Sequence, residues 1–158
     1  SGDVPEVTDD DGTSVRIICG EFWGQTGPVD GIATDPRYLD VWVPPGQRKT
    51  LPVETSRHAF AYVFAGAGTF RDASEPQAVL TEGVGTADGS PVENRSLVLF
   101  DNGDEVTVQA GESGIRFLLV SGQPLEEPVA WRGPIVMNTQ EELRAAYAEL
   151  NNGTFIKN

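Results

Sequence analysis

Apolar positions in this chain of 158 residues come in short runs that turn-forming residues separate. The clearest run, residues 38–43, alternates with a period of two and so places Leu39, Val41 and Val43 on one face, as in a half-buried strand. Further strands are expected at residues 15–19, 59–65, 77–80, 96–100, 105–110 and 115–121. The pattern predicts an all-β fold of short strands and tight turns.

The run at residues 59–65 is apolar on both faces, which indicates a strand buried on both sides. One face carries aromatic side chains and the other carries small ones: Phe60, Tyr62 and Phe64 on the first, and Ala59, Ala61, Val63 and Ala65 on the second. We expect the small-residue face to leave room in the lumen of a barrel.

The chain is long enough for one domain with a real core. Residues 1–12 are acidic and rich in turn formers, so we expect a linker or disordered tail there. The strand signals begin after this segment, and we assign the barrel to residues 13–137.

A helix is expected near the carboxy-terminal end, over residues 138–158 together with a short tail. Asn138 or Thr139 can cap it, each with a glutamate three residues later. Apolar residues then follow at positions i, i+4 and i+7, and these are Leu143, Tyr147 and Leu150. We expect this apolar stripe to pack on the barrel or on a partner domain.

The chain is strongly acidic, with a net charge of −13. Such a surface repels phosphate backbones, so we expect no direct binding of nucleic acid. No apolar run approaches the ~20 residues of a membrane helix, and residues 1–5 do not begin a signal peptide, so we expect a cytoplasmic protein without membrane contact. Cys19 is the only cysteine, which excludes an intramolecular disulfide and a cysteine-based metal site.

Residues 46–66 begin and end with a glycine. The distance between these two glycines resembles that in the first metal-binding motif of the cupins, G-x5-H-x-H-x4-E-x6-G. The positions of the two histidines and the glutamate hold Pro52, Glu54 and Ala59. The resemblance to this motif implies a double-stranded β-helix, or jelly-roll barrel, which the helix expected near the carboxy-terminal end would follow. The missing imidazoles argue against a metal, because histidine supplies most of the affinity for iron, copper or manganese in such sites.

A second cupin motif is expected downstream, and residues 103–111 keep its glycines. Gly111 and Gly114 are expected to join residues 105–110 and 115–121 as a hairpin. No imidazole stands near Gly114, where the histidine of this motif belongs. We therefore expect no metal or cofactor in this chain.

Glu54 and His58 are the only weak candidates for a metal site. His58, the sole histidine, lies four residues after Glu54 and can be interpreted as a remnant ligand, as a general base, or as a histidine hydrogen-bonded at a strand end. One histidine and one carboxylate do not complete a facial triad of two histidines and a carboxylate. We accordingly assign no catalytic, cofactor-binding or metal-binding residue.

The last third of the chain carries two short motifs, G-Q-P-L-E-E-P at residues 122–128 and G-P-I-V-M-N-T at residues 133–139, before a helix that opens with glutamate. With Ile135 in place of the usual phenylalanine, these motifs resemble the signature of the carboxy-terminal domain of the pirin family. The resemblance extends over about residues 13–158.

This resemblance implies a bicupin whose iron site, three histidines and a glutamate, lies in a first barrel that is absent here. Fe(II) is expected in that amino-terminal cupin domain, which would be the partner of this chain on the same or a separate polypeptide. This chain would then be a non-catalytic second barrel. For the whole protein, the family implies oxidoreductase activity of the quercetin 2,3-dioxygenase type or, in eukaryotes, transcriptional co-regulation.

Two other interpretations stay open. A stand-alone barrel without metal would bind a flavonoid-like small molecule in its lumen, behind the small-residue face of residues 59–65. An isolated enzyme would depend on a makeshift site at Glu54 and His58, which elemental analysis of the purified protein can test.

Overall fold

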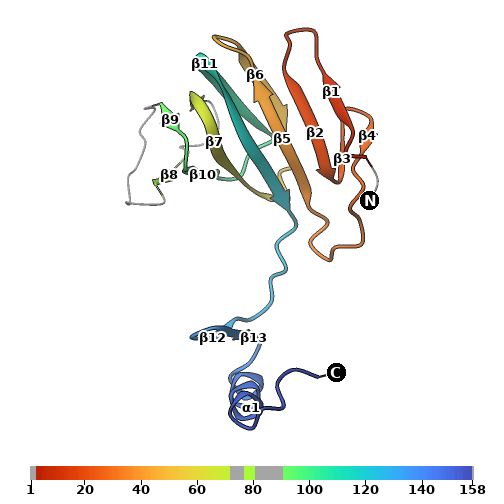
Figure 1. Ribbon diagram of the computed structural model, residues 1–158, viewed down its shortest axis with the longest axis vertical. Coiled ribbons are helices and arrows are strands. Elements are labelled where there is room, and N and C mark those ends of the chain that lie inside the picture. Colours follow the sequence, from red (N-terminus) through yellow and green to blue (C-terminus); the bar gives the residue numbers. More distant parts are fainter. Residues whose placement is uncertain (1–2, 72–76, 81–90, 158) are drawn as a thin grey trace. The chain divides into compact units, whose positions relative to one another are not determined.

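The computed structural model describes residues 3–71, 77–80 and 91–157 and divides into two compact units, Ser1–Pro124 and Leu125–Asn158. The first unit contains the main β-sheet, and the second contains a small hairpin and the helix (Figure 1). The expected all-β fold with one helix at the carboxy-terminal end is confirmed for the described residues. The boundary differs from the expected end of the barrel at residue 137, because residues 125–137 belong to the second unit.

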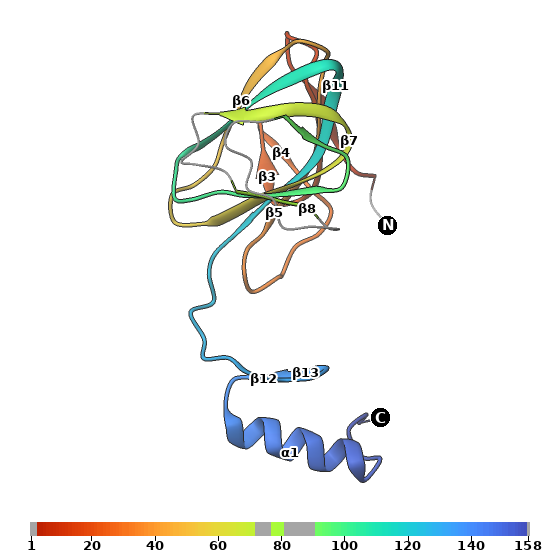
Figure 2. The same cartoon turned by 90° about the vertical axis from the view of Figure 1, so that its left-hand side faces the viewer.

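One antiparallel sheet builds the first unit. Its strands are β1 (Glu6–Thr8), β2 (Ser14–Cys19), β5 (Arg37–Val43), β6 (Arg48–Pro52), β7 (His58–Arg71), β8 (Gln77–Leu80), β9 (Val92–Glu93), β10 (Ser96–Leu99) and β11 (Glu105–Gly122). Their order is β1-β2-β5-β11-β7-β10-β8, with β6 also paired to β11 and β9 to β7. A separate short hairpin is formed by β3 (Glu21–Phe22) and β4 (Gln25–Thr26). Figure 2 shows the long strands β7 and β11 curving, so that the sheet wraps around its core.

Two glycines let the long strands β7 and β11 bend together. Gly66 and Gly114 have positive φ angles of 69° and 75°, and a Cβ atom on Gly66 would lie only 2.1 Å from the carbonyl oxygen of Gly114. The pairing of β7 with β11 changes register between Ala110 and Ile115, close to these glycines. The hairpin expected from residues 105–110 and 115–121 is wrong, because both belong to the single strand β11. The two glycines therefore permit a β-bulge and a close approach of the two backbones, and they do not form a turn.

The core confirms the face predicted for residues 38–43, since Leu39, Val41 and Val43 have no exposed surface. Ala61 and Val63, on the small-residue face of β7, are also completely buried. Aromatic side chains share this core: the rings of Phe70 and Phe117 meet edge to face, with centroids 5.2 Å apart. Cys19 is a buried free thiol whose Sγ donates a hydrogen bond to the carbonyl oxygen of Val29 at 3.0 Å.

The amino-terminal segment corrects the expectation of a linker or tail over residues 1–12, of which residues 1–2 lie outside the described part. Glu6–Thr8 forms β1 and pairs with β2. The carboxylates of Asp9 and Asp11 then both accept hydrogen bonds from Nζ of Lys49 on β6. The acidic residues that indicated a solvated tail therefore hold this segment to the sheet, because a nearly buried ammonium group requires partners.

The second unit consists of β12 (Ala130–Arg132), β13 (Ile135–Met137) and α1 (Gln140–Asn151). Its small core is made of Ala130, Ile135, Leu143 and Ala146. The expected capping box is confirmed at Thr139, whose hydroxyl accepts from the backbone of Glu142 while the Glu142 carboxylate accepts from the backbone of Thr139. Of the predicted helix stripe, Leu143 is buried and Tyr147 half-buried, whereas Leu150 is 46% exposed. No helix in the described part of the chain is long and apolar enough to cross a membrane.

Candidate functional site

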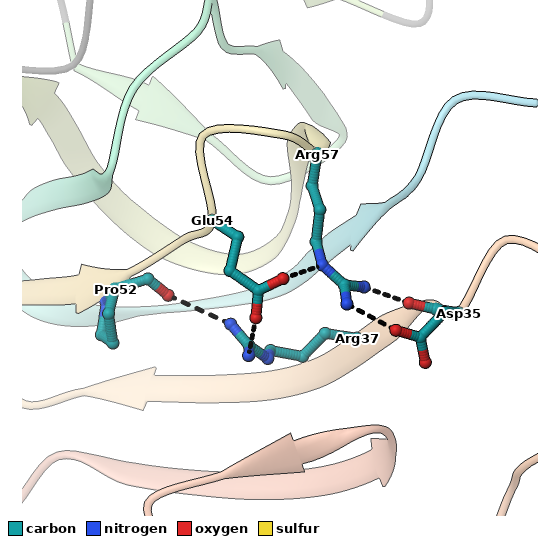
Figure 3. Close-up of polar contacts among 5 residues, drawn as sticks. All are labelled: Asp35, Arg37, Pro52, Glu54 and Arg57. Carbon is teal, nitrogen blue, oxygen red and sulfur yellow. Dashed lines mark hydrogen bonds and ion pairs between the residues drawn. The ribbon is translucent and has the colours of Figure 1, made fainter. Parts of the chain in front are cut away.

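Glu54 stands at a histidine position of the cupin motif and lies in the connection between β6 and β7. The backbone N–H of Arg57 donates to the carbonyl oxygen of Glu54 at 3.0 Å, which closes a tight turn over residues 54–57. This turn brings the two side chains together, and Nε of Arg57 donates to the Glu54 carboxylate (Figure 3).

A second guanidinium group reaches the same carboxylate from the start of β5. Nη2 of Arg37 donates to Oε1 of Glu54 at 2.8 Å, and Nη1 of Arg37 donates to the carbonyl oxygen of Pro52 at 3.5 Å. The Arg37 guanidinium also lies over the ring of Phe22, 5.8 Å from its centroid. The Arg37 side chain is only 18% exposed, so these contacts hold it against the end of the barrel.

Asp35 completes the network on the far side of Arg57. The Arg57 guanidinium donates to the Asp35 carboxylate at 2.6 Å and also to the backbone carbonyl oxygen of Asp35 (Figure 3). Asp35 has a φ angle of 43°, a left-handed conformation that is uncommon outside glycine. Since the Arg57 side chain is 9% exposed, its charge depends on Glu54 and Asp35 for compensation.

The charges of this network act on the Glu54 carboxyl group. The hydrogen bond from Arg57 lowers the pKa of Glu54, and the charges of Arg57 and Arg37 lower it further, against the opposing effect of burial. For Arg57, burial alone would lower the pKa, but the hydrogen bonds to Glu54 and Asp35 raise it on balance. Glu54 is therefore an ionised carboxylate already engaged by two cations.

This arrangement does not fit a metal centre. A metal ion would have to displace two guanidinium groups from Glu54 and approach their positive charges. The other two motif positions, Pro52 and Ala59, carry no ligand atom in their side chains. Within the part of the chain that the structure describes, no group of three or more His, Cys, Asp and Glu residues could hold a metal ion. The residues around Glu54 therefore do not fit an iron site, which the resemblance implies for the first barrel and not for this one.

His58 is not part of the network around Glu54. It is the exposed first residue of β7 and lies opposite Gly122 of β11. Among the described contacts, no hydrogen bond or ion pair joins His58 to Glu54, whose carboxylate is directed to Arg37 and Arg57. The structure thus does not assemble the pair that a makeshift enzyme site would need.

A cavity of about 620 Å³ opens beside this network. Its walls combine aromatic and charged side chains, among them Phe22, Trp23, Arg37, Glu54 and Arg57. The rings of Phe22 and Trp23 lie 4.8 Å apart, and Trp23 has a φ angle of 45°. The volume lies within the usual range of about 300–1,000 Å³ for small-molecule sites.

The sequence identified Glu54 but missed the arginines that hold it. The spacing of Glu54 and Arg57, three residues apart next to a turn, is a signal that could have shown their contact. Arg37 and Asp35 lie 17 and 22 residues from Glu54 and Arg57 along the chain, and no local pattern joins them. Only the arrangement of β5 beside the β6–β7 connection brings them together.

A family model described as the pirin C-terminal cupin domain matches residues 38–156. Among curated proteins, the chain is 36% identical over 155 residues to a pirin-like protein of Arabidopsis thaliana and 34% identical over 153 residues to a pirin-like protein of Caulobacter vibrioides. These matches cover 96% of this chain in both cases, but 46% and 49% of the relatives. The chain therefore spans about half the length of these relatives.

A crystal structure of a quercetin 2,3-dioxygenase from Acinetobacter baumannii has the same fold, with a TM-score of 0.76 and 28% sequence identity. The match covers 97% of this chain and 48% of that structure. Together with the family model, it confirms the expected cupin jelly roll.

Proposed function

Because the chain belongs to the pirin family, we propose that it acts as a non-catalytic second cupin barrel that supports an iron-binding first barrel. The observation that carries this proposal is the replacement of a metal ligand by Glu54, whose carboxylate is engaged by Arg37 and Arg57. The chain also spans about half of its relatives, which leaves length for a second domain of similar size.

For the whole protein we propose oxidoreductase activity of the quercetin 2,3-dioxygenase type or transcriptional co-regulation, with Fe(II) bound in the first barrel. The likeness to a quercetin 2,3-dioxygenase supports the first activity. We propose a cytoplasmic location for the protein.

A fusion protein tests this function. The amino-terminal half of the Caulobacter vibrioides pirin-like protein is joined to this chain in place of its own second half, and iron content and quercetin consumption are measured. We expect both in the fusion and neither in this chain alone. Stoichiometric iron or quercetin turnover in the isolated chain would contradict the proposal, as would a fusion that holds no iron.

The lumen site expected behind residues 59–65 is not found in the described part of the chain, because Ala61 and Val63 pack in the core and no residue of that run lines the cavity beside Glu54. That cavity instead supports a second proposed function, in which the barrel binds a flavonoid-like small molecule without metal.

The rings of Phe22 and Trp23 offer an apolar surface, and Arg37 offers a charged donor at its edge. Binding should raise the melting temperature of the chain. Thermal melts with quercetin compare the wild-type chain with Trp23→Ala; equal, unshifted melting temperatures with and without quercetin would rule this function out.

A further inference from the structure

A groove of about 430 Å³ lies on the first unit, and all of its described wall residues belong to that unit. The strands that carry them, β1, β2, β5, β11 and β7, follow one another in the sheet (Figure 1). On β5 the wall residues Asp40 and Trp42 flank Val41, which is completely buried, so the groove lies on the face of the sheet opposite the core. None of its described wall residues lines the cavity beside Glu54.

Trp42 supplies the aromatic wall of the groove. It lies between Ser14 of β2 and Arg116 of β11 in one row of residues across the strands. A Cβ atom on Gly114 would lie 2.4 Å from Cη2 of Trp42, so the indole occupies space that only a glycine leaves free at position 114. The ring is half-buried and held in this place. Its free surface can therefore receive an apolar group of a ligand at little cost in conformational freedom.

Asp40 and Arg116 form an ion pair with two hydrogen bonds beside Trp42. Nε and Nη2 of Arg116 donate to the two carboxylate oxygens of Asp40 at 2.8 and 2.6 Å. The Arg116 guanidinium also lies 5.3 Å from the centroid of the Phe64 ring, and the Asp40 side chain is only 13% exposed. Both groups are thus fixed, and the N–H groups and lone pairs that remain on them have set directions.

A second ion pair continues the groove across the sheet. Arg16 of β2 lies directly opposite Asp40 on one side and Glu6 of β1 on the other. Nε of Arg16 donates to Oε2 of Glu6 at 2.6 Å. Within the described part of the chain, these bonds leave both Nη atoms of Arg16 and Nη1 of Arg116 without a hydrogen-bond partner. The groove therefore offers charged donors and carboxylate acceptors side by side.

The charges of the groove favour a neutral ligand. Its walls hold two guanidinium groups and two carboxylates, which balance each other. An anion would be repelled by the net charge of −13 of the chain, and a cation would approach two guanidinium groups. A neutral ligand that contacts both kinds of group has to accept hydrogen bonds from the arginines and donate them to the carboxylates. A hydroxyl group does both.

Sugar rings combine such hydroxyl groups with an apolar face. Neighbouring hydroxyls of one ring can each accept from a guanidinium group and donate to a carboxylate. The C–H groups of the ring carry a slight positive charge and are attracted to the negative face of an indole. The volume of the groove also lies within the range of about 300–1,000 Å³ that is usual for small-molecule sites.

We propose that this groove binds a neutral oligosaccharide. One sugar ring lies on Trp42, and its hydroxyl groups bond to Arg16, Asp40 and Arg116. Binding there needs neither iron nor the cavity beside Glu54.

An array of neutral and acidic oligosaccharides, probed with the full chain, tests this site. We expect binding to neutral oligosaccharides only, and the one with the strongest signal is then titrated by calorimetry. Trp42→Ala should weaken its binding at least about tenfold, whereas Trp42→Tyr keeps an aromatic face and should weaken it by less than about threefold. Trp131→Ala, which removes the tryptophan of β12 in the second unit, is the matched control and should have no effect.

Arg16→Gln separates loss of the site from loss of folding. The Arg16 side chain is 53% exposed and its ion pair with Glu6 is a surface pair, so the melting temperature should stay within error of the wild-type value. Oligosaccharide binding should nevertheless weaken about tenfold, because a hydroxyl group loses a charged donor. Arg144→Gln, at an exposed position of α1, is the matched control and should change neither.

Three results would overturn the inference. The first is an array on which the full chain binds no neutral oligosaccharide. The second is binding to acidic oligosaccharides alone. The third is binding to a neutral oligosaccharide that survives both Trp42→Ala and Arg16→Gln, which would place the sugar elsewhere on the chain.

Discussion

The carboxylate of Glu54 accepts a hydrogen bond of 2.8 Å from Nη2 of Arg37, which links the connection after β6 to the first residue of β5. In the cupin motif this position carries a metal ligand. Here it carries a carboxylate between two guanidinium groups, which links β5 to the connection between β6 and β7. The network is therefore expected to contribute to stability.

Replacing Glu54 with glutamine tests this role. The amide keeps the shape but loses the charge, so the nearly buried Arg57 retains only Asp35 as an anionic partner. We expect the free energy of unfolding at pH 7 to fall by about 1 kcal/mol, a modest value because the Glu54 side chain is 47% exposed. Urea titrations measure it, with Glu21→Gln on the same cavity wall as the control. Equal losses in both variants would show that the network has no special role.

The hydrogen bond between Lys49 and Asp11 should make the free energy of unfolding depend on pH in acidic solution. The hydrogen bond from Lys49 lowers the pKa of Asp11 to about 2 in the folded protein. A carboxyl group with a depressed pKa stabilises the fold above its unfolded pKa of about 3.9, and this contribution is lost as the pH falls toward the folded value. We expect the free energy of unfolding to decrease between about pH 5 and pH 2 for this reason.

Lys49→Met removes the shared partner of Asp11 and Asp9, since the same lysine lowers the pKa of both carboxyl groups. The Lys49 side chain is 10% exposed and lies 5.0 Å from the centroid of the Trp23 ring, so methionine can fill its place but cannot pair with Asp11. At pH 7 we expect the free energy of unfolding of this variant to be about 1 kcal/mol lower than that of the wild-type chain. Unfolding measured at several pH values should show the difference from wild type shrinking as the pH falls from about 5 to 2. A difference that stays constant over this range would contradict the assignment to the carboxyl groups paired with Lys49, Asp11 and Asp9.

His58 is expected to be dispensable. It is exposed at the start of β7, apart from the network of Glu54. In the fusion protein, His58→Ala should leave the iron content, quercetin turnover and melting temperature unchanged within error, since substitutions at such surface sites usually change stability by less than about 0.5 kcal/mol. Loss of iron in this variant would restore His58 as a ligand candidate.

Local patterns in the sequence predicted the elements that depend on local physics. The alternation at Leu39, Val41 and Val43 and the capping box at Thr139 both act within a few residues, and both are confirmed. Glycine was ambiguous, because Gly114 needs a positive φ angle at a bulge for the same reason that it would need one in a turn. A bulge can be told from a turn only when the partner strand is known.

The features that the sequence did not predict depend on contacts between residues that lie far apart along the chain. Lys49 meets Asp11 across 38 residues, so the acidic segment near the amino-terminal end carried no sign that it joins the sheet. For the same reason Glu54 was identified by its place in the motif, whereas its partner Arg37 was not. The motif identified the positions at which the metal ligands are missing. It did not identify the arginine side chains that bind Glu54 at one of these positions.

The close approach of Gly66 and Gly114 gives the sharpest test of the bulge. A methyl group on Gly66 would meet the Gly114 carbonyl oxygen at 2.1 Å, and backbone cannot move aside as a flexible side chain can. We expect Gly66→Ala to lower the free energy of unfolding by about 3 kcal/mol or more, since strained backbone and a clash add together.

Gly46→Ala is the matched control for Gly66→Ala, because both glycines have a φ angle of 69° but no atom lies within 4 Å of a Cβ on Gly46. It carries only the cost of a left-handed alanine, about 1 kcal/mol. Urea titrations of both variants therefore separate the clash from the backbone conformation. Similar losses of unfolding free energy in the two variants would mean that β7 and β11 can move apart at the bulge. The two glycines that frame the motif would then be needed only for their positive φ angles.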